Sequence, residues 1–229
     1  MNPELEDMLA AGPVFRDRTD AGRVLAAELE RYRGTDALVL GLPRGGVVVA
    51  AEVARQLDAE LDVIVARKLG SPLSPELAIG AVTAEGGVFL NRRLIYELGI
   101  SEPYVSAVIH TERSAAERRE ALFRGARPRP RIAGRTVILV DDGLATGATM
   151  HAAVRSVRRE APARLIVAVP VGSPEACAAL RGDSDEVVCP YQPEEFGAVG
   201  LWYRRFGQTD DTEVKELLDE LGAAARSAP

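Results

Sequence analysis

Short apolar runs alternate with amphipathic segments along most of the 229-residue chain. The apolar runs are rich in β-branched residues and cover residues 37–41, 61–66, 136–140, 165–170 and 185–189. Segments of helical periodicity lie between them, at residues 19–34, 47–57, 148–160 and 173–180. Because strands that alternate with helices form parallel sheets covered on both faces, the pattern predicts an α/β fold built on one parallel sheet.

An inserted region, roughly residues 70–133, interrupts this alternation between the second and third strands. Within it, residues 77–82 and 87–90 predict a β-hairpin, and residues 102–123 predict a helix. That helix has charged residues around most of its circumference, which is typical of a solvent-exposed face with ion pairs four residues apart.

The length of the chain suits one substantial domain with its own core. We predict a single domain over residues 1–229, with a core at about 15–190 that includes the insertion. A small C-terminal region and a helix at 211–221 complete it, within about 190–222.

The formal charge of −6 argues against non-specific nucleic-acid binding. Residues 1–7 lack the basic and then apolar pattern of a signal peptide, and no apolar run is long enough to span a membrane. We therefore expect a cytoplasmic protein with neither nucleic acid nor membrane as a partner. Cys177 and Cys189 have no metal-binding motif beside them and are expected to be ordinary buried thiols.

The most informative group of polar residues follows the third predicted strand, residues 136–140. Asp141 and Asp142 come directly after its apolar residues, and a loop with two glycines then leads into a helix. Ligands of open parallel sheets gather at this edge, where a helix N-terminus offers free N–H groups to an anion. A phosphate cradle beside two carboxylates suits a sugar phosphate. The cradle residues are Ala145, Thr146, Gly147, Ala148 and Thr149.

Two further strand ends show phosphate-compatible residues. Arg44 follows the first strand and can bind an anion, while Gly45 and Gly46 permit close approach of the backbone. Arg67 and Lys68 follow the second strand and place two cations at the same edge. Each element alone also fits an ordinary helix entry or a solvated surface, but the three together favour a phosphate site.

The segment from Asp141 to Thr149 resembles the signature of the type I phosphoribosyltransferases, in which two acids precede a loop that ends in Thr-Gly-x-Thr. The resemblance implies that Asp141 and Asp142 hold the ribose hydroxyls of phosphoribosyl pyrophosphate (PRPP). It also implies that residues 145–149 bind the 5′-phosphate. Mg²⁺ is the implied cofactor, held mainly through PRPP, with the two aspartates as available ligands.

The same resemblance makes residues 42–46 the pyrophosphate loop, with the peptide bond before Arg44 as a candidate cis linkage. Arg44, Arg67 and Lys68 would neutralise the leaving pyrophosphate, and Arg44 and Lys68 join the two aspartates as the implied catalytic residues. Residues 70–90 occupy the place of the loop that covers the site in this family.

The acceptor is implied to be a small nitrogenous base, which would give the protein a role in nucleotide salvage. Ala145 stands where hypoxanthine and guanine enzymes usually have an aspartate, so the loop is similar to the adenine-specific form. Trp202 and Tyr203, in a C-terminal hood, could stack on the base, or they could seal the C-terminal helix against the core. Phe196 and Phe206 are further candidates of the same kind.

The leading hypothesis is therefore an enzyme that transfers phosphoribose from PRPP to a base. A regulatory protein that binds PRPP without catalysis is the main alternative, and a metal-dependent phosphohydrolase is a weaker one. His110 and His151 are expected to be structural or exposed. The sequence leaves open whether the chain forms a homodimer.

Overall fold

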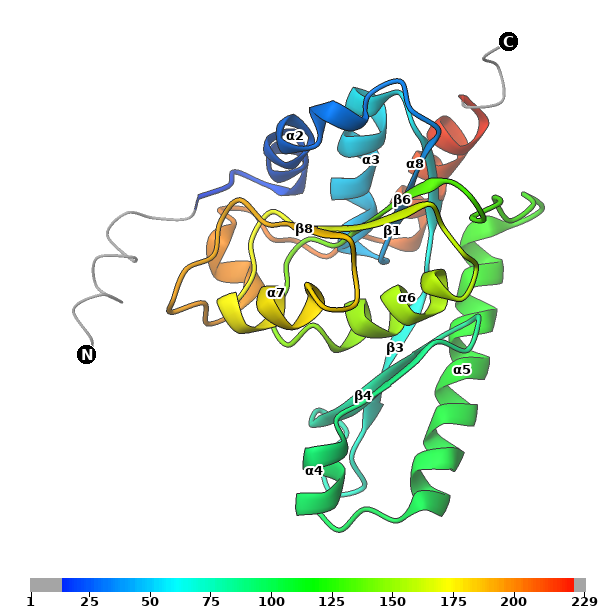
Figure 1. Cartoon of the computed structure of the whole chain (residues 1–229), viewed down its shortest axis with the longest axis vertical. Helices are drawn as coiled ribbons and strands as arrows, with labels where there is room; N and C mark the ends of the chain where they lie inside the picture. Colours follow the sequence, from blue (N-terminus) through cyan, green and yellow to red (C-terminus); the bar gives the residue numbers. More distant parts are fainter. Residues whose placement is uncertain (1–13, 225–229) are drawn as a thin grey trace.

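The protein is described by a computed structural model that covers residues 14–224 (Figure 1). Its centre is a five-stranded parallel sheet in the order β2-β1-β6-β7-β8. The strands are β1 (Ala37–Gly41), β2 (Glu60–Val63), β6 (Thr136–Val140), β7 (Arg164–Ala168) and β8 (Glu186–Val188). The predicted α/β fold with a parallel sheet is confirmed.

Helices cover both faces of this sheet, as Figure 1 shows. One face packs against α2 (Arg18–Glu28), α3 (Gly45–Leu57) and α8 (Asp211–Ala224), and the other against α6 (Ala148–Arg158) and α7 (Pro174–Leu180). Successive strand residues alternate between the two cores, with Val39 and Ile138 on one side and Leu38 and Leu139 on the other. Because both faces are buried, the central strands are continuously apolar.

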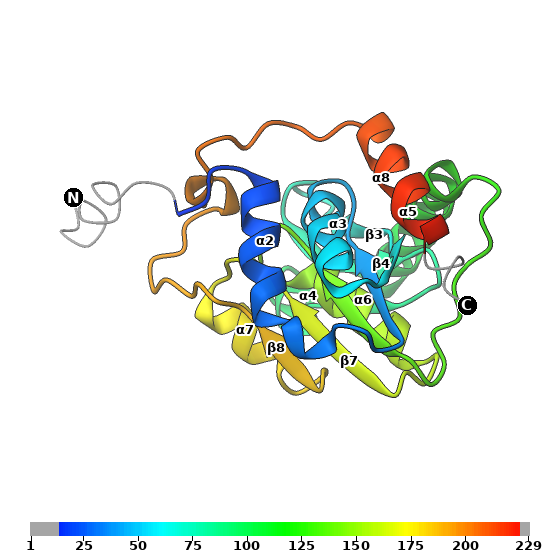
Figure 2. The ribbon, with the colours of Figure 1, turned by 90° about the horizontal axis from the view of Figure 1, so that it is seen from above.

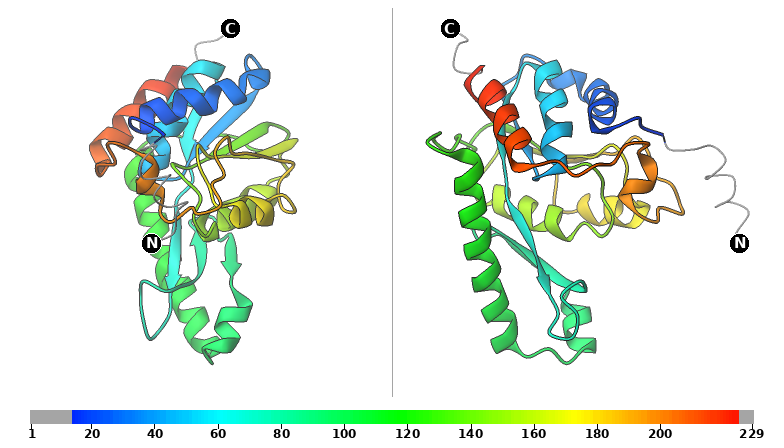
Figure 3. Two further views of the ribbon diagram at one scale, coloured as in Figure 1. Left: turned by 90° about the vertical axis from the view of Figure 1, so that its left-hand side faces the viewer. Right: turned by 180° about the vertical axis from the view of Figure 1, so that it is seen from behind.

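The inserted region forms a second lobe that projects away from the parallel sheet (Figures 1 and 3). The lobe contains an antiparallel sheet and two helices, with a small apolar core between them. Its elements are β3 (Ala66–Gly70), β4 (Ala78–Thr83), β5 (Val88–Leu90), α4 (Arg92–Glu97) and α5 (Glu102–Arg124). The predicted hairpin and charged helix are confirmed, whereas β3 and α4 were not predicted.

The position of Arg67 and Lys68 requires a correction. They lie within β3 and pair with Val82 and Ala81 of β4, so they do not end a strand of the parallel sheet. After Val63 the chain leaves the parallel sheet, and residues 66–70 pair instead with the antiparallel strand β4.

The first helix also begins differently from the prediction. The helix was predicted from residue 19, but its N-cap is Asp17, whose side chain accepts a hydrogen bond from the Asp20 N–H at 3.0 Å. Arg18 is therefore the first helical residue. Short 3₁₀ turns at Glu30–Tyr32 and Val199–Trp202 complete the described elements. In Figure 2 the segment before α8 runs along the upper edge of the picture, beside α2 and α3. None of the helices within residues 14–224 has both the length and the apolar character that a bilayer span requires.

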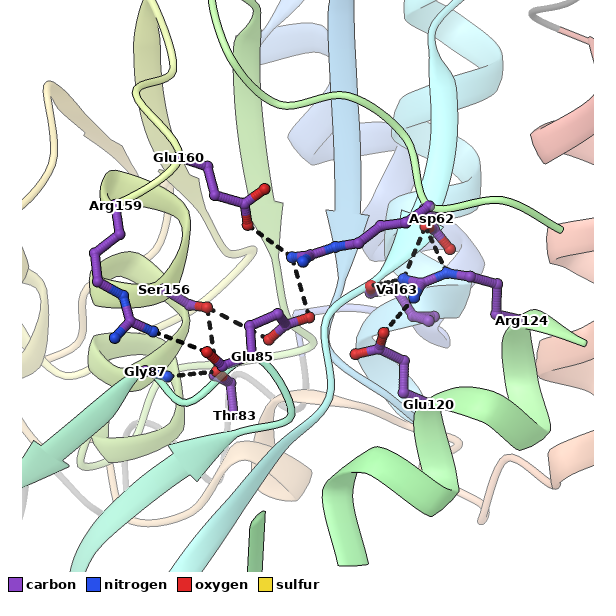
Figure 4. A network of polar contacts seen from close by, with 11 residues as sticks. Asp62, Val63, Thr83, Glu85, Gly87, Glu120, Arg124, Ser156, Arg159 and Glu160 are labelled. Atoms are coloured by element: carbon purple, nitrogen blue, oxygen red, sulfur yellow. Dashed lines mark hydrogen bonds and ion pairs between the residues drawn. The ribbon is translucent and has the colours of Figure 1, made fainter. Parts of the chain in front are cut away.

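A polar network joins the second lobe to the parallel sheet (Figure 4). Arg124 of α5 pairs with Asp62 of β2 at 3.0 Å and also with Glu120 one turn earlier. Glu120 lies within hydrogen-bond reach of Glu85, which sits in the turn between β4 and β5. Arg129 completes the network by pairing with Glu85 at 3.2 Å.

The two facing carboxyl groups hold different charges near neutral pH. Burial, the hydrogen bond with Glu85 and the charge of Glu85 raise the pKa of Glu120 to about 7. Burial would also raise the pKa of Glu85, but the hydrogen bond from Glu120 and the charge of Arg129 lower it. We infer that the pair holds one proton, on Glu120, through the mildly acidic range.

This proton makes the stability of the protein depend on pH. In the unfolded chain Glu120 loses its proton near its ordinary pKa of 4.5, whereas the folded protein keeps it up to about pH 7. The free energy of unfolding should therefore fall between pH 4.5 and 7, by up to about 3 kcal/mol from this group, and then level off. Urea unfolding of Glu120→Gln across this range should show a smaller fall. Glu117→Gln, on the exposed face of the same helix, should keep the wild-type profile, and equal profiles for the two variants would contradict the assignment.

Candidate functional site

Two adjacent carboxylates mark the carboxyl end of β6. Asp141 and Asp142 are both half-buried, and the side chain of Asp141 accepts a hydrogen bond from the Asp142 N–H at 2.8 Å. The hydroxyl of Tyr203 donates to the backbone carbonyl of Asp142 at 2.5 Å. The acid pair is thus held by its own backbone and by the C-terminal segment.

Arg18 completes this centre, and the sequence interpretation did not include it. Its Nε lies 2.7 Å from Oδ2 of Asp142, and its Nη1 donates to the carbonyl of Gly207 at 2.7 Å. The guanidinium carbon lies 3.9 Å from the ring centroid of Phe206, and only 13% of the side chain is exposed. The partner lies 124 positions away in the chain, so no local sequence signal could have identified the pair.

The carboxyl groups resist ionisation because they lie side by side and are partly removed from solvent. Burial raises the pKa of Asp141 well above its ordinary value, and the neighbouring charge of Asp142 adds to the effect, while Arg18 and Lys68 oppose it. Burial also raises the pKa of Asp142, against the charge of Arg18. An added cation or hydroxyl donor would favour the ionised pair, so the site is chemically suited to such ligands.

The loop after β1 lies directly on the acid pair. A methyl group at Gly45 would meet Oδ2 of Asp142 at 2.1 Å, and one at Gly46 would meet Oδ1 of Asp141 at 2.8 Å. The peptide bond between Pro43 and Arg44 is cis, as predicted. The absence of side chains at both glycines is what lets two loops from neighbouring strands share this space.

The loop after the acids ends in the N-terminus of α6. Gly147 is the N-cap with φ of +72°, a conformation that favours glycine, and no side chain caps the helix. Thr149 is half-buried, whereas Ala145 and Thr146 are exposed. Because the first N–H groups of a helix have no partner within it, this turn can bind an anion beside the acid pair.

The three basic residues predicted for the site lie around the acid pair, each with different neighbours. Arg44 is partly exposed and its Nη1 lies 3.7 Å from Asp211. Arg67 pairs with Glu112 of α5. Lys68 is exposed, and its charge acts on Asp141. Arg67, Lys68 and Thr149 line one cavity of about 590 Å³ between β3, the loop that follows it and α5.

Trp202 and Tyr203 lie in a buried aromatic cluster. The indole Nε1 of Trp202 donates to the Phe196 carbonyl at 3.0 Å, and the Tyr203 ring lies 5.4 Å from that of Phe15. Only 7% and 5% of the two residues are exposed, and they pack against Phe15 and the start of α2 and not against the described part of the C-terminal helix. Stacking of either ring on a base stays a prediction. Phe206 is more open, but one face of its ring lies against Arg18.

The two cysteines and His151, which could in principle bind a metal, are instead buried within the fold. Cys177 and Cys189 are free and buried, as expected. His151 is buried in α6 and stacks on Phe89 at 4.6 Å. Across residues 14–224 there is no group of three or more His, Cys, Asp or Glu side chains that could bind a metal.

Comparison with known proteins identifies relatives of this arrangement. Residues 16–200 match the family model described as the phosphoribosyl transferase domain. A Mycobacterium tuberculosis H37Rv protein named "Putative phosphoribosyl transferase" is 45% identical over 206 residues, which are 90% of this chain and 46% of that protein. An adenine phosphoribosyltransferase of the same strain is 33% identical over 147 residues, 64% of this chain and 52% of that enzyme. The chain therefore spans about half the length of these curated relatives.

A solved structure matches more completely. The crystal structure of the protein TT1426 from Thermus thermophilus has a TM-score of 0.76 and 45% sequence identity, and the match covers 90% of this chain and 98% of that one. The similarity extends over both lobes, because it includes most of the chain.

The close approach of the two loops can be tested by Gly46→Ala. The new methyl group would meet backbone atoms, with Asp141 Cα at 2.9 Å and the Val140 carbonyl at 3.0 Å, so the acid pair or the loop must shift. We expect a loss of about 1–3 kcal/mol in the free energy of unfolding, measured by thermal or urea denaturation. Gly182→Ala is the control, since nothing lies within 4 Å of a methyl group there. Equal stabilities of the two variants would refute the tight contact.

Proposed function

The chain belongs to the phosphoribosyl transferase domain family, and we propose that it transfers phosphoribose from PRPP to a nitrogenous base and releases pyrophosphate. The observation that supports this most directly is the acid pair at the end of β6, beside an uncapped helix N-terminus. Carboxylates accept hydrogen bonds from vicinal hydroxyls, and the helix N-terminus binds phosphate. One short segment thus offers both groups that a ribose 5-phosphate requires.

In this proposal Asp141 and Asp142 bind the ribose hydroxyls, and residues 145–149 bind the 5′-phosphate. Asp142 already has one oxygen in its ion pair with Arg18, at 2.7 Å. Arg18 then acts as a positioning residue that fixes the orientation of this carboxylate. Asp141 keeps the freer carboxylate of the two, with one hydrogen bond from the adjacent backbone.

The reaction forms a bond from the base nitrogen to the anomeric carbon, breaks the bond from that carbon to pyrophosphate, and releases the proton of that nitrogen. The pyrophosphate takes the electron pair, and positive charge develops on the ribose ring. We propose that Arg44, Arg67 and Lys68 offset the charge of the leaving group. Arg67 pairs with Glu112 in the structure, so it would exchange that partner for pyrophosphate.

The acid pair also fits the Mg²⁺ that we propose as the cofactor. Mg²⁺ keeps several waters and binds proteins through one or two carboxylates together with substrate phosphates. Asp141 and Asp142 are adjacent, and the charge of a cation would favour their ionised forms. When bound, Mg²⁺ would neutralise the charge that the departing pyrophosphate acquires.

The proposed acceptor is a small planar base, with adenine as the first candidate. The Ala145 loop is similar to the adenine-specific form, and one of the relatives is an adenine phosphoribosyltransferase. The cavity between β3 and α5 adjoins the phosphate loop at Thr149 and has room for a ring of this size.

Substrate binding should be measured by isothermal titration of PRPP in the presence of Mg²⁺. Replacing both acids, Asp141→Asn/Asp142→Asn, should weaken binding roughly 10- to 100-fold, because charge-assisted hydrogen bonds to the ribose are lost. Asp219→Asn, a control at a side chain that is 74% exposed on α8, should bind as the wild type does. Absence of wild-type binding would rule out both the transferase and a PRPP-dependent regulator.

Catalysis should be tested separately, by pyrophosphate release with adenine and other bases. A transferase should release pyrophosphate with at least one base, and the double aspartate variant should lose most of this activity. PRPP binding without turnover on any base tested would favour the regulatory protein over the enzyme.

A further inference from the structure

A second cavity lies at the other end of α6, away from the phosphate loop. It occupies about 590 Å³ between the C-terminal half of the helix and the turn that joins β4 to β5. Three arginines of the helix segment, Arg155, Arg158 and Arg159, line it. We call this cavity the arginine pocket. It shares no lining residue with the cavity that contains Arg67 and Lys68.

The arginines of the pocket are positioned mainly by backbone carbonyls. Arg155 donates from Nη1 to the Val88 carbonyl at 3.0 Å, and Arg159 donates from Nη2 to the Glu85 carbonyl at 3.0 Å. A carbonyl orients a guanidinium without neutralising its charge. Each guanidinium has five N–H donors, so several remain for a ligand.

The charges in the pocket do not cancel. Arg158 pairs with Asp185 at 3.0 Å, but within residues 14–224 neither Arg155 nor Arg159 is in an ion pair with a carboxylate. Asp183 is the acidic side chain of the lining, and it lies 3.3 Å from Nδ1 of His151. Two unneutralised guanidinium groups against one carboxylate leave the cavity positive.

The location of these arginines at the C-terminal end of α6 explains part of their presence. Arg155 and Arg158 lie in the last turn of α6, where cations offset the partial negative charge of a helix C-terminus. That partial charge is only about half an elementary charge, less than the two unneutralised guanidinium groups supply. It also gives no reason for three arginines to line one cavity.

The opposite wall of the pocket is fixed in place. Gly86 has φ of +79°, and a methyl group at Gly87 would meet the Ala152 carbonyl at 2.4 Å. Gly87 also donates its N–H to the hydroxyl of Thr83 at 2.9 Å, as Figure 4 shows. The turn therefore rests directly against α6, and the carbonyls that orient Arg155 and Arg159 come from a rigid element.

We propose that the arginine pocket binds a small molecule that bears a chain of phosphate groups, at a site separate from the PRPP site. Guanidinium groups bind phosphate oxygens through pairs of parallel hydrogen bonds, and two of them can grip successive phosphates. The volume lies within the usual range of small-molecule sites. Val88 and Val154 supply an apolar wall that a nucleoside could contact.

The site is tested by titrating the full chain with inorganic tripolyphosphate in the absence of Mg²⁺. Arg155→Gln/Arg159→Gln should weaken binding at least 10-fold. A control with the same change in charge, Arg93→Gln/Arg118→Gln, alters exposed arginines in the second lobe and should change binding less than two-fold. The same titration with ATP identifies the source of the phosphates, because tighter binding of ATP than of tripolyphosphate indicates a nucleotide. Equal affinity in the pocket variant and the wild type, or no binding of either probe, would overturn the proposal.

A spectroscopic measurement keeps the test decisive if the double variant does not fold. In ¹⁵N-labelled wild-type protein, tripolyphosphate should shift the amide signals of Gly86 and Gly87, whereas shifts confined to residues 145–149 would place the anion at the phosphate loop and refute the pocket. PRPP binding should survive in the pocket variant. The outcome is therefore independent of whether the proposed transfer reaction is correct.

Discussion

The structure depends most on the placement of two adjacent carboxylates at the end of a buried strand. Ionised carboxylates in such a position are costly, and the surrounding elements reduce this cost in specific ways. Arg18 supplies a counter-charge from α2, and the two glycines after β1 supply space. Tyr203 fixes the backbone from the C-terminal segment. The first helix, the first loop and the last segment before α8 therefore all converge on one pair of side chains.

Buried carboxyl groups also face each other where the second lobe meets the sheet. There Glu85 and Glu120 share a retained proton, in addition to their ion pairs with Arg129 and Arg124. Arg124 neutralises Asp62 close by. Both sites therefore pair one carboxyl group with an arginine, while burial raises the pKa of the other.

Much of this arrangement follows from local sequence. The β-branched runs predicted β1 and β6 at their observed residues, and the acids, loop and helix after β6 were located from one continuous segment. The contacts that depend on tertiary structure could not be predicted. Arg18 meets Asp142 only because the fold brings α2 to the sheet edge, and Arg67 lies in β3 because the chain leaves the parallel sheet after Val63. A hairpin strand with two basic residues has no apolar alternation that would distinguish it from a loop.

Arg18 has a mechanical consequence as well as an electrostatic one. It connects the start of α2 to Asp142 and to the carbonyl of Gly207, and Phe15 pairs with Tyr203 a few residues away. Residues 15–18 and 203–207 thus hold the acid pair between them. Loss of the contacts of either segment would free Asp142 to change its orientation, so the geometry of this site depends on both segments being in place.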